Sequence, residues 1–332
     1  MESLETRKKD HIDLAFKSQT GRLEIDDRFH YEPMLAAHPS GGLAPFDFLG
    51  REHKLPMWVS SMTGGTKLAG TINRNLARAC REFGMGMGLG SCRIILGDDT
   101  YFEDFNMRPV IGPDMPLWAN LGIAQIEELL DQGKTQLAAE LVKKLQADGL
   151  IIHVNPMQEW FQPEGDVLKY PPLETIKRFM DGFDHPLIVK EVGQGIGPGS
   201  LKALLQLPLQ AIEFAAFGGT NFARVELLRD ERADAALFEP MSYIGEDALS
   251  MVESVNNIIA SEPPVCKELI ISGGVKNFLD GYHLIQKSHL PAIYGMASTF
   301  LKYAQEDYDQ LHKFVEGQVR GLEMAYAYLT VK

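Results

Sequence analysis

The stretch Leu150–Glu159 (LIIHVNPMQE) combines a buried strand with the residue types of a reactive site. Its first five residues are mostly apolar and β-branched, which predicts a buried β-strand. His153 lies near the end of this strand, and Asn155, Gln158 and Glu159 follow closely. An imidazole can carry a proton, amides can orient polar groups, and a carboxylate can hold a cation. We therefore predict a cofactor, metal or substrate site at this strand end.

Glu159 has the surroundings expected of a metal ligand. Its near neighbour in sequence is the acidic Glu164, and no basic residue follows before Lys169. The amides of Asn155 and Gln158 add further oxygen ligands. Mg²⁺ prefers oxygen ligands and is usually shared between one or two carboxylates and a substrate phosphate. The pattern favours Mg²⁺ at Glu159, although a single carboxylate is weak evidence by itself.

A lysine stands inside a second apolar run, Leu187–Val192 (LIVKEV). A buried lysine is costly unless it meets an anion or an electron-rich ring. An ion pair between Lys190 and Glu191 is the structural alternative, but adjacent residues of a strand point to opposite faces. We therefore expect Lys190 to face a ligand.

Three later segments are small-residue turns that lead towards helices: Gly218–Asn221 (GGTN), Ser272–Lys276 (SGGVK) and Tyr294–Ser298 (YGMAS). Such turns can point backbone N–H groups at an anion. Any one of them could simply be a tight turn. Three at successive strand ends, with Thr220 and Ser298 beside them, favour a phosphate-bearing cofactor.

Eight short apolar segments, typical of strands, would position these residues. The expected strands are Met57–Ser61, Met85–Leu89, Leu117–Leu121, Leu150–Val154, Leu187–Val192, Ala211–Phe214, Leu269–Ser272 and Ala292–Tyr294. The expected helices between them are Leu68–Phe83, Ile123–Leu145, Leu173–Met180, Ser200–Leu205, Gly245–Ile259 and Leu279–Gln286. Alternation of strands and helices predicts parallel pairing, and eight strands favour a closed (β/α)₈ TIM barrel with its site at the carboxyl ends of the strands. The first strand is not followed by G-x-G-x-x-G, which disfavours a dinucleotide-binding open sheet.

The remaining segments frame this barrel. We expect residues 1–55 to form an N-terminal extension and residues 56–332 to form the barrel domain. A helix is expected over Thr6–Lys17, an irregular covering segment over Phe29–Leu49, and a closing helix over Tyr308–Leu329. Longer irregular insertions are expected at Arg93–Pro116 and Phe217–Met241.

The composition limits the possible partners. The chain has 332 residues, 45% hydrophobic and 23% charged, with a formal net charge of −13. This charge argues against nucleic acid or an anionic membrane surface as the main partner. Three widely spaced cysteines suggest neither a disulfide framework nor a zinc site, and no signal peptide or membrane-spanning run is apparent. We expect a cytoplasmic protein.

The motifs, taken in order, resemble those of the type 2 isopentenyl-diphosphate isomerases, the flavin-dependent isomerases of isoprenoid synthesis. They are RKKDH (7–11), SSMTGG, GSCR, the AN of WANLG, HVNPMQE, VKEVGQG, GGTN, SGGV and YGMAS. Each is short, but the ordered set spans nearly the whole chain. The resemblance implies an FMN-containing barrel that interconverts isopentenyl and dimethylallyl diphosphate. It further implies Mg²⁺, NADPH as the usual reductant of the flavin, and a homo-oligomer, a tetramer or octamer.

The resemblance also implies a role for each matched residue. FMN would be held by Ser61, Met62, Thr63, Ser91, Asn120, Lys190, Thr220, Gly273, Gly274, Ala297 and Ser298. The diphosphate substrate would meet Arg7, Lys8, His11, Ser91, Arg93, His153, Asn155 and Gln158, with Glu159 on Mg²⁺. His153 and Gln158 would lie nearest the reacting alkene. The N-terminal segment would then act as a lid, whereas Arg7 and Lys8 would otherwise be a solvated helix start.

The implied chemistry agrees with the residue types. Moving a carbon–carbon double bond requires a proton to be added at one carbon and removed from another, through a cationic transition state. The sequence shows no carboxylate pair of the usual acid–base kind. A reduced flavin can carry protons and supply electron density to a developing cation. We therefore predict that N5 of reduced FMN is the acid, rather than a His153–Glu159 pair.

Three residues depart from the family pattern. Cys92 stands in the GSCR turn where a non-thiol residue is usual. Lys276 follows Val275 where arginine is common, and Ser298 stands where some members have arginine. A lysine or serine can contact phosphate, but without the bidentate geometry of arginine.

Two other classes remain as alternatives. An FMN-dependent 2-hydroxy-acid oxidase or dehydrogenase would share the barrel and the phosphate turns, but the residues that follow the seventh strand (SGGVKNF) lack the expected histidine and arginine. A non-catalytic flavin-binding protein would not need Gln158 and Glu159.

Overall fold

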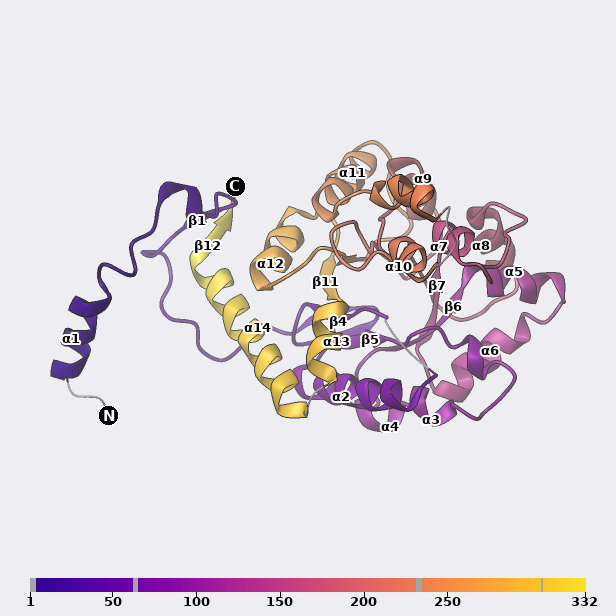
Figure 1. Cartoon of the computed structure of the whole chain (residues 1–332), viewed down its shortest axis with the longest axis horizontal. Coiled ribbons are helices and arrows are strands. Elements are labelled where there is room, and N and C mark those ends of the chain that lie inside the picture. Colours follow the sequence, from indigo (N-terminus) through magenta and orange to yellow (C-terminus); the bar gives the residue numbers. More distant parts are fainter. Residues whose placement is uncertain (1–3, 62–64, 231–234, 306) are drawn as a thin grey trace.

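Eight parallel strands close into a barrel, which confirms the predicted fold class. The computed structural model describes residues 4–61, 65–230, 235–305 and 307–332. Around the barrel the strands lie in the order β10-β11-β4-β5-β6-β7-β8-β9 (Figure 1). Their bounds are β4 Met57–Val59, β5 Gly86–Gly88, β6 Leu117–Gly122, β7 Gly149–His153, β8 Leu187–Lys190, β9 Ala211–Glu213, β10 Leu269–Ser272 and β11 Ala292–Met296. Each predicted strand segment overlaps one of them, although β6, β7 and β11 each extend beyond the predicted bounds.

Helices surround the barrel, and most lie where the apolar periodicity predicts. They are α2 Lys67–Phe83, α5 Ile123–Asp131, α6 Gln136–Leu145, α8 Pro172–Met180, α9 Pro198–Leu205, α11 Ala248–Ser261, α12 Phe278–Lys287, α13 Ser298–Ala304 and α14 Tyr308–Tyr328. The prediction of one helix over Ile123–Leu145 is wrong, because α5 ends at Asp131 and a separate helix, α6, begins at Gln136. Gly133 takes a left-handed φ of 63° at the break, a conformation that a helix interior does not allow.

The two insertions expected to be irregular contain short helices. The first holds η2 Arg93–Ile95, α3 Phe102–Phe105 and α4 Arg108–Ile111; the second holds α10 Phe222–Arg229 and the start of η3 Ala235–Tyr243. Asn221 caps α10, accepting from the Arg224 backbone N–H at 2.9 Å. A further short helix, α7 Pro156–Phe161, directly follows β7. These α-helices of four to eight residues are too short for apolar periodicity to reveal.

The N-terminal extension is partly ordered by strand pairing. β1 Phe29–Tyr31 pairs antiparallel with β12 Leu329–Val331 at the other end of the chain, and β2 Phe46–Phe48 pairs with β3 Arg51–His53. The expectation of a wholly irregular Phe29–Leu49 segment is therefore wrong. A 3₁₀ turn, η1 Arg22–Glu24, precedes β1. The first helix, α1 Leu4–Leu14, has no buried residue and stands away from the barrel (Figure 1).

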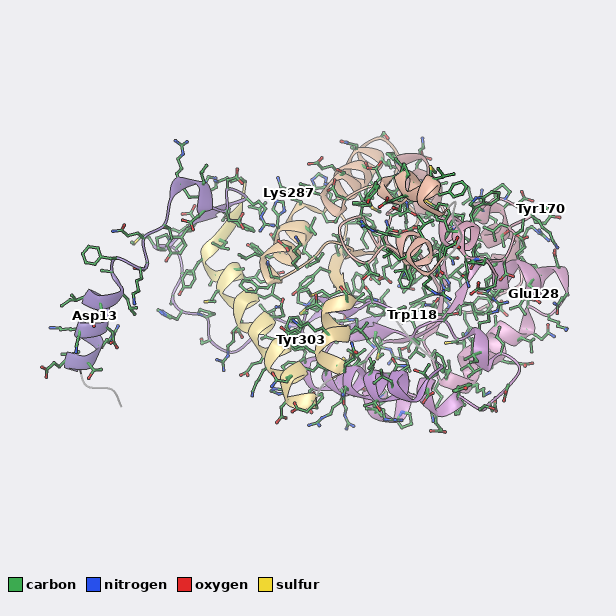
Figure 2. All side chains as sticks on the ribbon, viewed as in Figure 1. Asp13, Trp118, Glu128, Tyr170, Lys287 and Tyr303 are labelled. Carbon is green, nitrogen blue, oxygen red and sulfur yellow. The ribbon has the colours of Figure 1, made fainter. Side chains whose placement is uncertain are left out.

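Large side chains fill the interior of the barrel at its amino-terminal end. Trp58 and Trp118 are buried there with Phe48 and aliphatic residues of the neighbouring strands (Figure 2 labels Trp118). Room for the two indoles depends on glycine, because a Cβ at Gly86 would overlap Trp58 and one at Gly149 would overlap Trp118. These side chains close the barrel interior at this end, so the space inside the barrel lies towards the carboxyl ends of the strands. None of the helices described is both long and apolar enough to cross a membrane.

Candidate active site

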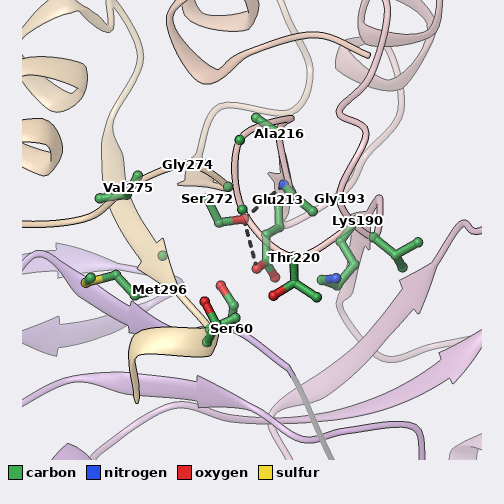
Figure 3. A pocket seen from close by; sticks show the side chains of 18 of the residues that line it. Ser60, Lys190, Gly193, Glu213, Ala216, Thr220, Ser272, Gly274, Val275 and Met296 are labelled. Carbon is green, nitrogen blue, oxygen red and sulfur yellow. Dashed lines mark hydrogen bonds between the residues drawn. The ribbon is translucent and has the colours of Figure 1, made fainter. Parts of the chain in front are cut away.

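A cavity of about 410 Å³ opens at the carboxyl ends of β8 to β11 and β4 (Figure 3). The structure brings several predicted cofactor ligands together on its wall: Ser61, Lys190, Thr220, Gly273, Gly274, Ala297 and Ser298. Lys276 also lines it, so this departure from the family pattern faces the cavity. The same wall includes residues that the sequence analysis did not single out, among them Glu213 and Ser272.

The turns after β9 and β10 line this cavity with glycines, whose backbone is not covered by side chains. Gly218, Gly273 and Gly274 have φ values of 116°, 92° and 72°, which other residues rarely adopt. A Cβ at Gly273 would overlap the backbone N and O of Ala216. The close packing of the two turns therefore requires glycine at position 273.

Several buried polar atoms at the cavity have no protein partner. The Ser60 and Ser61 hydroxyls and one carboxylate oxygen of Glu213 are buried without a hydrogen bond among the described residues. Lys190 is only 6% exposed, and its ammonium donates to the Glu191 carbonyl at 2.7 Å. Buried polar groups in native proteins are nearly always hydrogen-bonded. These groups therefore indicate a polar ligand.

The alternative role for Lys190, an ion pair with Glu191, does not occur. The Glu191 carboxylate accepts from the backbone N–H groups of Gly193 and Gln194, both at 2.6 Å, and from Gly195 at 3.1 Å. Burial raises the pKa of Glu191, while these N–H groups and the Lys190 charge act in the opposite direction. Glu191 thus shapes the loop after β8 and leaves Lys190 to the cavity.

His153 lies at the end of β7, beside Lys190 in the strand register. Asn120 donates through Nδ2 to the Leu89 carbonyl at 3.0 Å, so its Oδ1 is left to accept from His153 Nδ1, at 2.8 Å. Burial, and secondarily the Lys190 charge, lowers the pKa of His153 to about 3. His153 is therefore neutral near pH 7, with its proton on Nδ1.

The side chains that follow His153 form a hydrogen-bonded network in which Asn155 Oδ1 is buried without a partner among the described residues. Asn155 donates to Gln158 Oε1 at 3.1 Å and to Glu159 Oε1 at 2.9 Å. Gln158 in turn donates to Glu226 Oε1 at 3.1 Å, and the Asp166 backbone N–H donates to Glu159 Oε2 at 2.9 Å. The described residues include no cluster of three or more His, Cys, Asp or Glu that could hold a metal. Glu159 thus offers a cation one carboxylate, which already has protein partners.

Arg93 lies at the rim near this network. Its guanidinium donates to Asp166 Oδ2 at 3.0 Å, and Gln125 donates to the same oxygen at 3.3 Å. Ser91 is exposed on the same loop. Cys92 between them is buried in the core; burial raises its pKa to about 12, and its thiol donates to the Gly90 carbonyl at 3.4 Å. The departure at Cys92 therefore points away from the site.

Some residues predicted to bind the substrate or the cofactor do not line the cavity. Arg7, Lys8 and His11 lie on the exposed helix α1, apart from the barrel mouth (Figure 1). Ser91 and Asn120 are not among the cavity's lining residues. The predicted cofactor ligands Met62 and Thr63 fall outside the described residues.

Three acidic residues of the site were missed in the sequence. Glu213 is a lone charge in an apolar strand, the same signal that drew attention to Lys190. Glu226 and Asp166 carry no such signal, because each reaches the site only when α10 and the loop after α7 pack beside β7.

Comparison with known proteins gives relatives over nearly the whole chain. No family model matches. The chain is 33% identical over 321 residues to an isopentenyl-diphosphate delta-isomerase of Rickettsia felis, covering 93% of this chain and 88% of that protein. It is 35% identical over 283 residues to the enzyme of that name from Deinococcus radiodurans, with 83% and 80% covered. It is 33% identical over 322 residues to the enzyme of that name from Nostoc sp., covering 94% of this chain and 88% of that protein.

Solved structures with the same fold are flavoproteins of low sequence identity. A mandelate oxidase variant with a monooxide FMN adduct has a TM-score of 0.57 at 14% identity, covering 92% of this chain and 88% of that one. The flavin-binding domain of baker's yeast flavocytochrome b2 has a TM-score of 0.62 at 13% identity, covering 90% and 71%. At such identities the likeness establishes the barrel fold alone.

Proposed function

Because the chain belongs to the type 2 isopentenyl-diphosphate delta-isomerase family, we propose that it interconverts isopentenyl and dimethylallyl diphosphate, using reduced FMN and Mg²⁺. The observation that carries the proposal is the junction of two sites at one barrel mouth. A cavity with unpartnered polar groups adjoins the His153–Glu159 network through the neighbouring Lys190. One site suits a phosphate-bearing cofactor and the other an anionic substrate with a cation.

The cavity residues fit FMN. The glycine turns, which include Gly273 and Gly274, would supply backbone N–H groups for a phosphate. Thr220 and Ser298 beside them would supply hydroxyl groups. Lys190 and the unpartnered Ser61 hydroxyl supply donors for the polar edge of the ring and the ribityl chain. We assign Ala297 to the same wall, and Met62, Thr63, Ser91 and Asn120 to FMN on the family resemblance. The chemistry that FMN would supply is proton transfer at N5 and electron density beside a developing cation.

The network after β7 suits the diphosphate and its cation. Arg93, His153, Asn155 and Gln158 are hydrogen-bonding groups at one rim, with Ser91 beside Arg93. Glu159 would hold Mg²⁺ jointly with phosphate oxygens, as is usual for Mg²⁺ at phosphate sites. Binding would then require Arg93 to exchange Asp166 for the diphosphate.

In this proposal the side chains of the site position the alkene and do not themselves gain or lose the transferred proton. His153 keeps its proton on Nδ1, directed at Asn120, so Nε2 can accept but cannot act as an acid. Gln158 is held by Asn155 and Glu226 and can orient the reacting end of the substrate. Lys190 supplies a fixed positive charge near both ligands. The neutral state of His153 supports our assignment of proton donation to N5 of reduced FMN, which would supply that chemistry when bound.

The remaining assignments rest on the family resemblance. Arg7, Lys8 and His11 would reach the diphosphate when α1 moves onto a barrel mouth as a lid. NADPH would be the reductant, the protein would work in the cytoplasm, and it would assemble as a tetramer or octamer.

The solved flavoproteins of the same fold raise a second possibility, oxidation of a 2-hydroxy acid. That chemistry needs a base for the hydroxyl proton and an arginine for the carboxylate. The turn after β10 offers Lys276 and Asn277 instead of a histidine and an arginine. The observation therefore disfavours this activity.

The proposal is tested with purified protein reconstituted with FMN. Protein supplied with dithionite, Mg²⁺ and isopentenyl diphosphate should form dimethylallyl diphosphate, whereas omission of FMN or of the reductant should abolish the product. A protein that takes up no FMN, or a yellow protein that forms no isomer, contradicts the proposal. Reduction of the flavin by a 2-hydroxy acid would instead support the oxidase.

A further inference from the structure

Glu213 is a fully buried carboxylate at the cavity wall, with an exposure of 0%. It lies at the end of β9, in register with Lys190 of the neighbouring strand β8. Register partners on adjacent parallel strands point to the same face of the sheet. Figure 3 accordingly shows Glu213, Lys190 and Ser60 reaching towards the same space.

A fixed serine orients this carboxylate. The Ala215 backbone N–H donates to Ser272 Oγ at 2.9 Å, so the single hydroxyl proton of Ser272 is free to be donated to Glu213 Oε1, at 3.1 Å. The second oxygen, Oε2, is buried and has no partner among the described residues. Nor do the ion pairs within the described part of the chain join Glu213 to Lys190.

A buried carboxylate with one free oxygen is costly unless something else donates to it. Ser272 fixes the orientation of Glu213 at the cavity wall, while Oε2 stays buried beside the cavity without a partner among the described residues. A positive and a negative side chain thus flank the same space: Lys190 donates to one backbone carbonyl, and Glu213 Oε2 has no partner among the described residues. A ligand that bears both donors and acceptors would satisfy both.

We propose that Glu213 tunes the bound flavin: Oε2 accepts a hydrogen bond from it, and the negative charge offsets Lys190 and disfavours reduction. The proposal rests on the proposed function, because the ligand it invokes is FMN. Two electrons and one proton convert the neutral oxidised ring into an anionic reduced ring. A fixed anion nearby opposes that gain of charge, as it opposes the ionisation of a neighbouring acid. Glu213 would therefore keep the reduced flavin electron-rich, as protonation of an alkene demands.

A structural role for Glu213 makes a different prediction. If the carboxylate served only to hold Ser272 and the turn after β10, its replacement would lower the unfolding temperature and leave the flavin potential unchanged. The reduction potential therefore separates the two roles.

The test is the two-electron reduction potential of bound FMN, measured by anaerobic dithionite titration against a reference dye. In the Glu213→Gln variant, reduced FMN should gain affinity over oxidised FMN at least about tenfold, which raises the potential by about 30 mV. Glu213→Asp keeps the charge and should leave the potential near the wild-type value. Glu268→Gln is the matched control, because Glu268 adjoins the opposite end of β10, where it accepts from the Leu49 N–H and Gln210.

Should Glu213→Gln fail to fold, Glu213→Met is neutral, of similar length, and carries the same prediction. A folded neutral variant with an unchanged or lower potential would overturn the inference and leave the proposed function intact. A wild-type protein that takes up no FMN would overturn both.

Discussion

The two halves of the barrel mouth differ in how far they are satisfied without a ligand. The glycine-turn half, formed by the cavity residues at β9 to β11 and β4 with Lys190, contains three buried polar atoms without partners among the described residues: Ser60 Oγ, Ser61 Oγ and Glu213 Oε2. The α7 half, formed by His153, Asn155, Gln158, Glu159 and Arg93, engages each of its side chains in at least one hydrogen bond. Among the described residues it leaves one buried side-chain atom, Asn155 Oδ1, without a partner. A ligand can add hydrogen bonds to the glycine-turn half directly, whereas the α7 half must exchange existing hydrogen bonds to bind one.

The difference assigns the halves to different kinds of ligand. A preformed site binds without ordering costs, which suits a cofactor that stays bound. A network that must break hydrogen bonds binds a ligand more weakly, and it favours ligands that can replace those bonds. This suits a substrate that binds and leaves in each turnover. The two are coupled through the neighbouring strand ends at His153 and Lys190.

The largest expected effect separates the halves outright. Glu159→Gln removes the negative charge that would hold Mg²⁺ but leaves the cavity untouched, so turnover should fall about 100-fold while FMN remains bound. Steady-state assays and the flavin absorbance measure the two properties. Glu164→Gln, on the exposed carboxylate paired with Arg229, is the control and should retain activity. Loss of FMN from Glu159→Gln would show that the halves are one site.

The glycine-turn half should fail in the opposite manner. Gly273→Ala would force a side chain against the Ala216 backbone at a φ of 92°, which costs about 1–3 kcal/mol of strain. FMN affinity should fall about tenfold or more, measured by fluorescence titration, with a lower unfolding temperature. Gly317→Ala on α14 meets open space, so it should leave FMN affinity unchanged and should not lower the unfolding temperature, because alanine favours a helix interior over glycine. Normal FMN binding by Gly273→Ala would refute a preformed site.

A smaller effect tests whether the α7 half must open. Asp166→Asn frees Arg93 from an exposed ion pair of about 0.2–1 kcal/mol, so the KM for isopentenyl diphosphate should fall by up to about fivefold. Glu316→Gln, which breaks an exposed pair with Arg320 on α14, should not change KM. A raised KM would mean instead that Asp166 positions Arg93 for the substrate.

The smallest effect concerns pH. Since the pKa of His153 is about 3, its ionisation should be absent from kcat/KM between pH 5 and 8. The unfolded chain binds a proton on His153 below about pH 6.5, so burying it neutral makes the folded state less stable as the pH falls from 6.5. His153→Asn should weaken this acid sensitivity in thermal unfolding. An NMR titration of His153 near pH 6.5 would contradict the assignment.

The barrel could be predicted because each strand is a separate apolar run followed by a small or polar turn. Lys190 could be identified for a local reason, a charge inside an apolar strand, and Glu213 carries the same signal. Glu226 and Asp166 could not, because only tertiary packing brings them to Gln158 and Arg93. The position of α1 was equally inaccessible, since an exposed helix has no buried face to define its place.

The most direct test of the account is the origin of the transferred proton. Protein loaded with FMN, reduced with dithionite and supplied with Mg²⁺ and isopentenyl diphosphate in heavy water should place deuterium in the new methyl group of dimethylallyl diphosphate, as read by NMR. The account predicts this label only when FMN is bound and reduced. Labelled product without FMN, or none with reduced FMN bound, would contradict it.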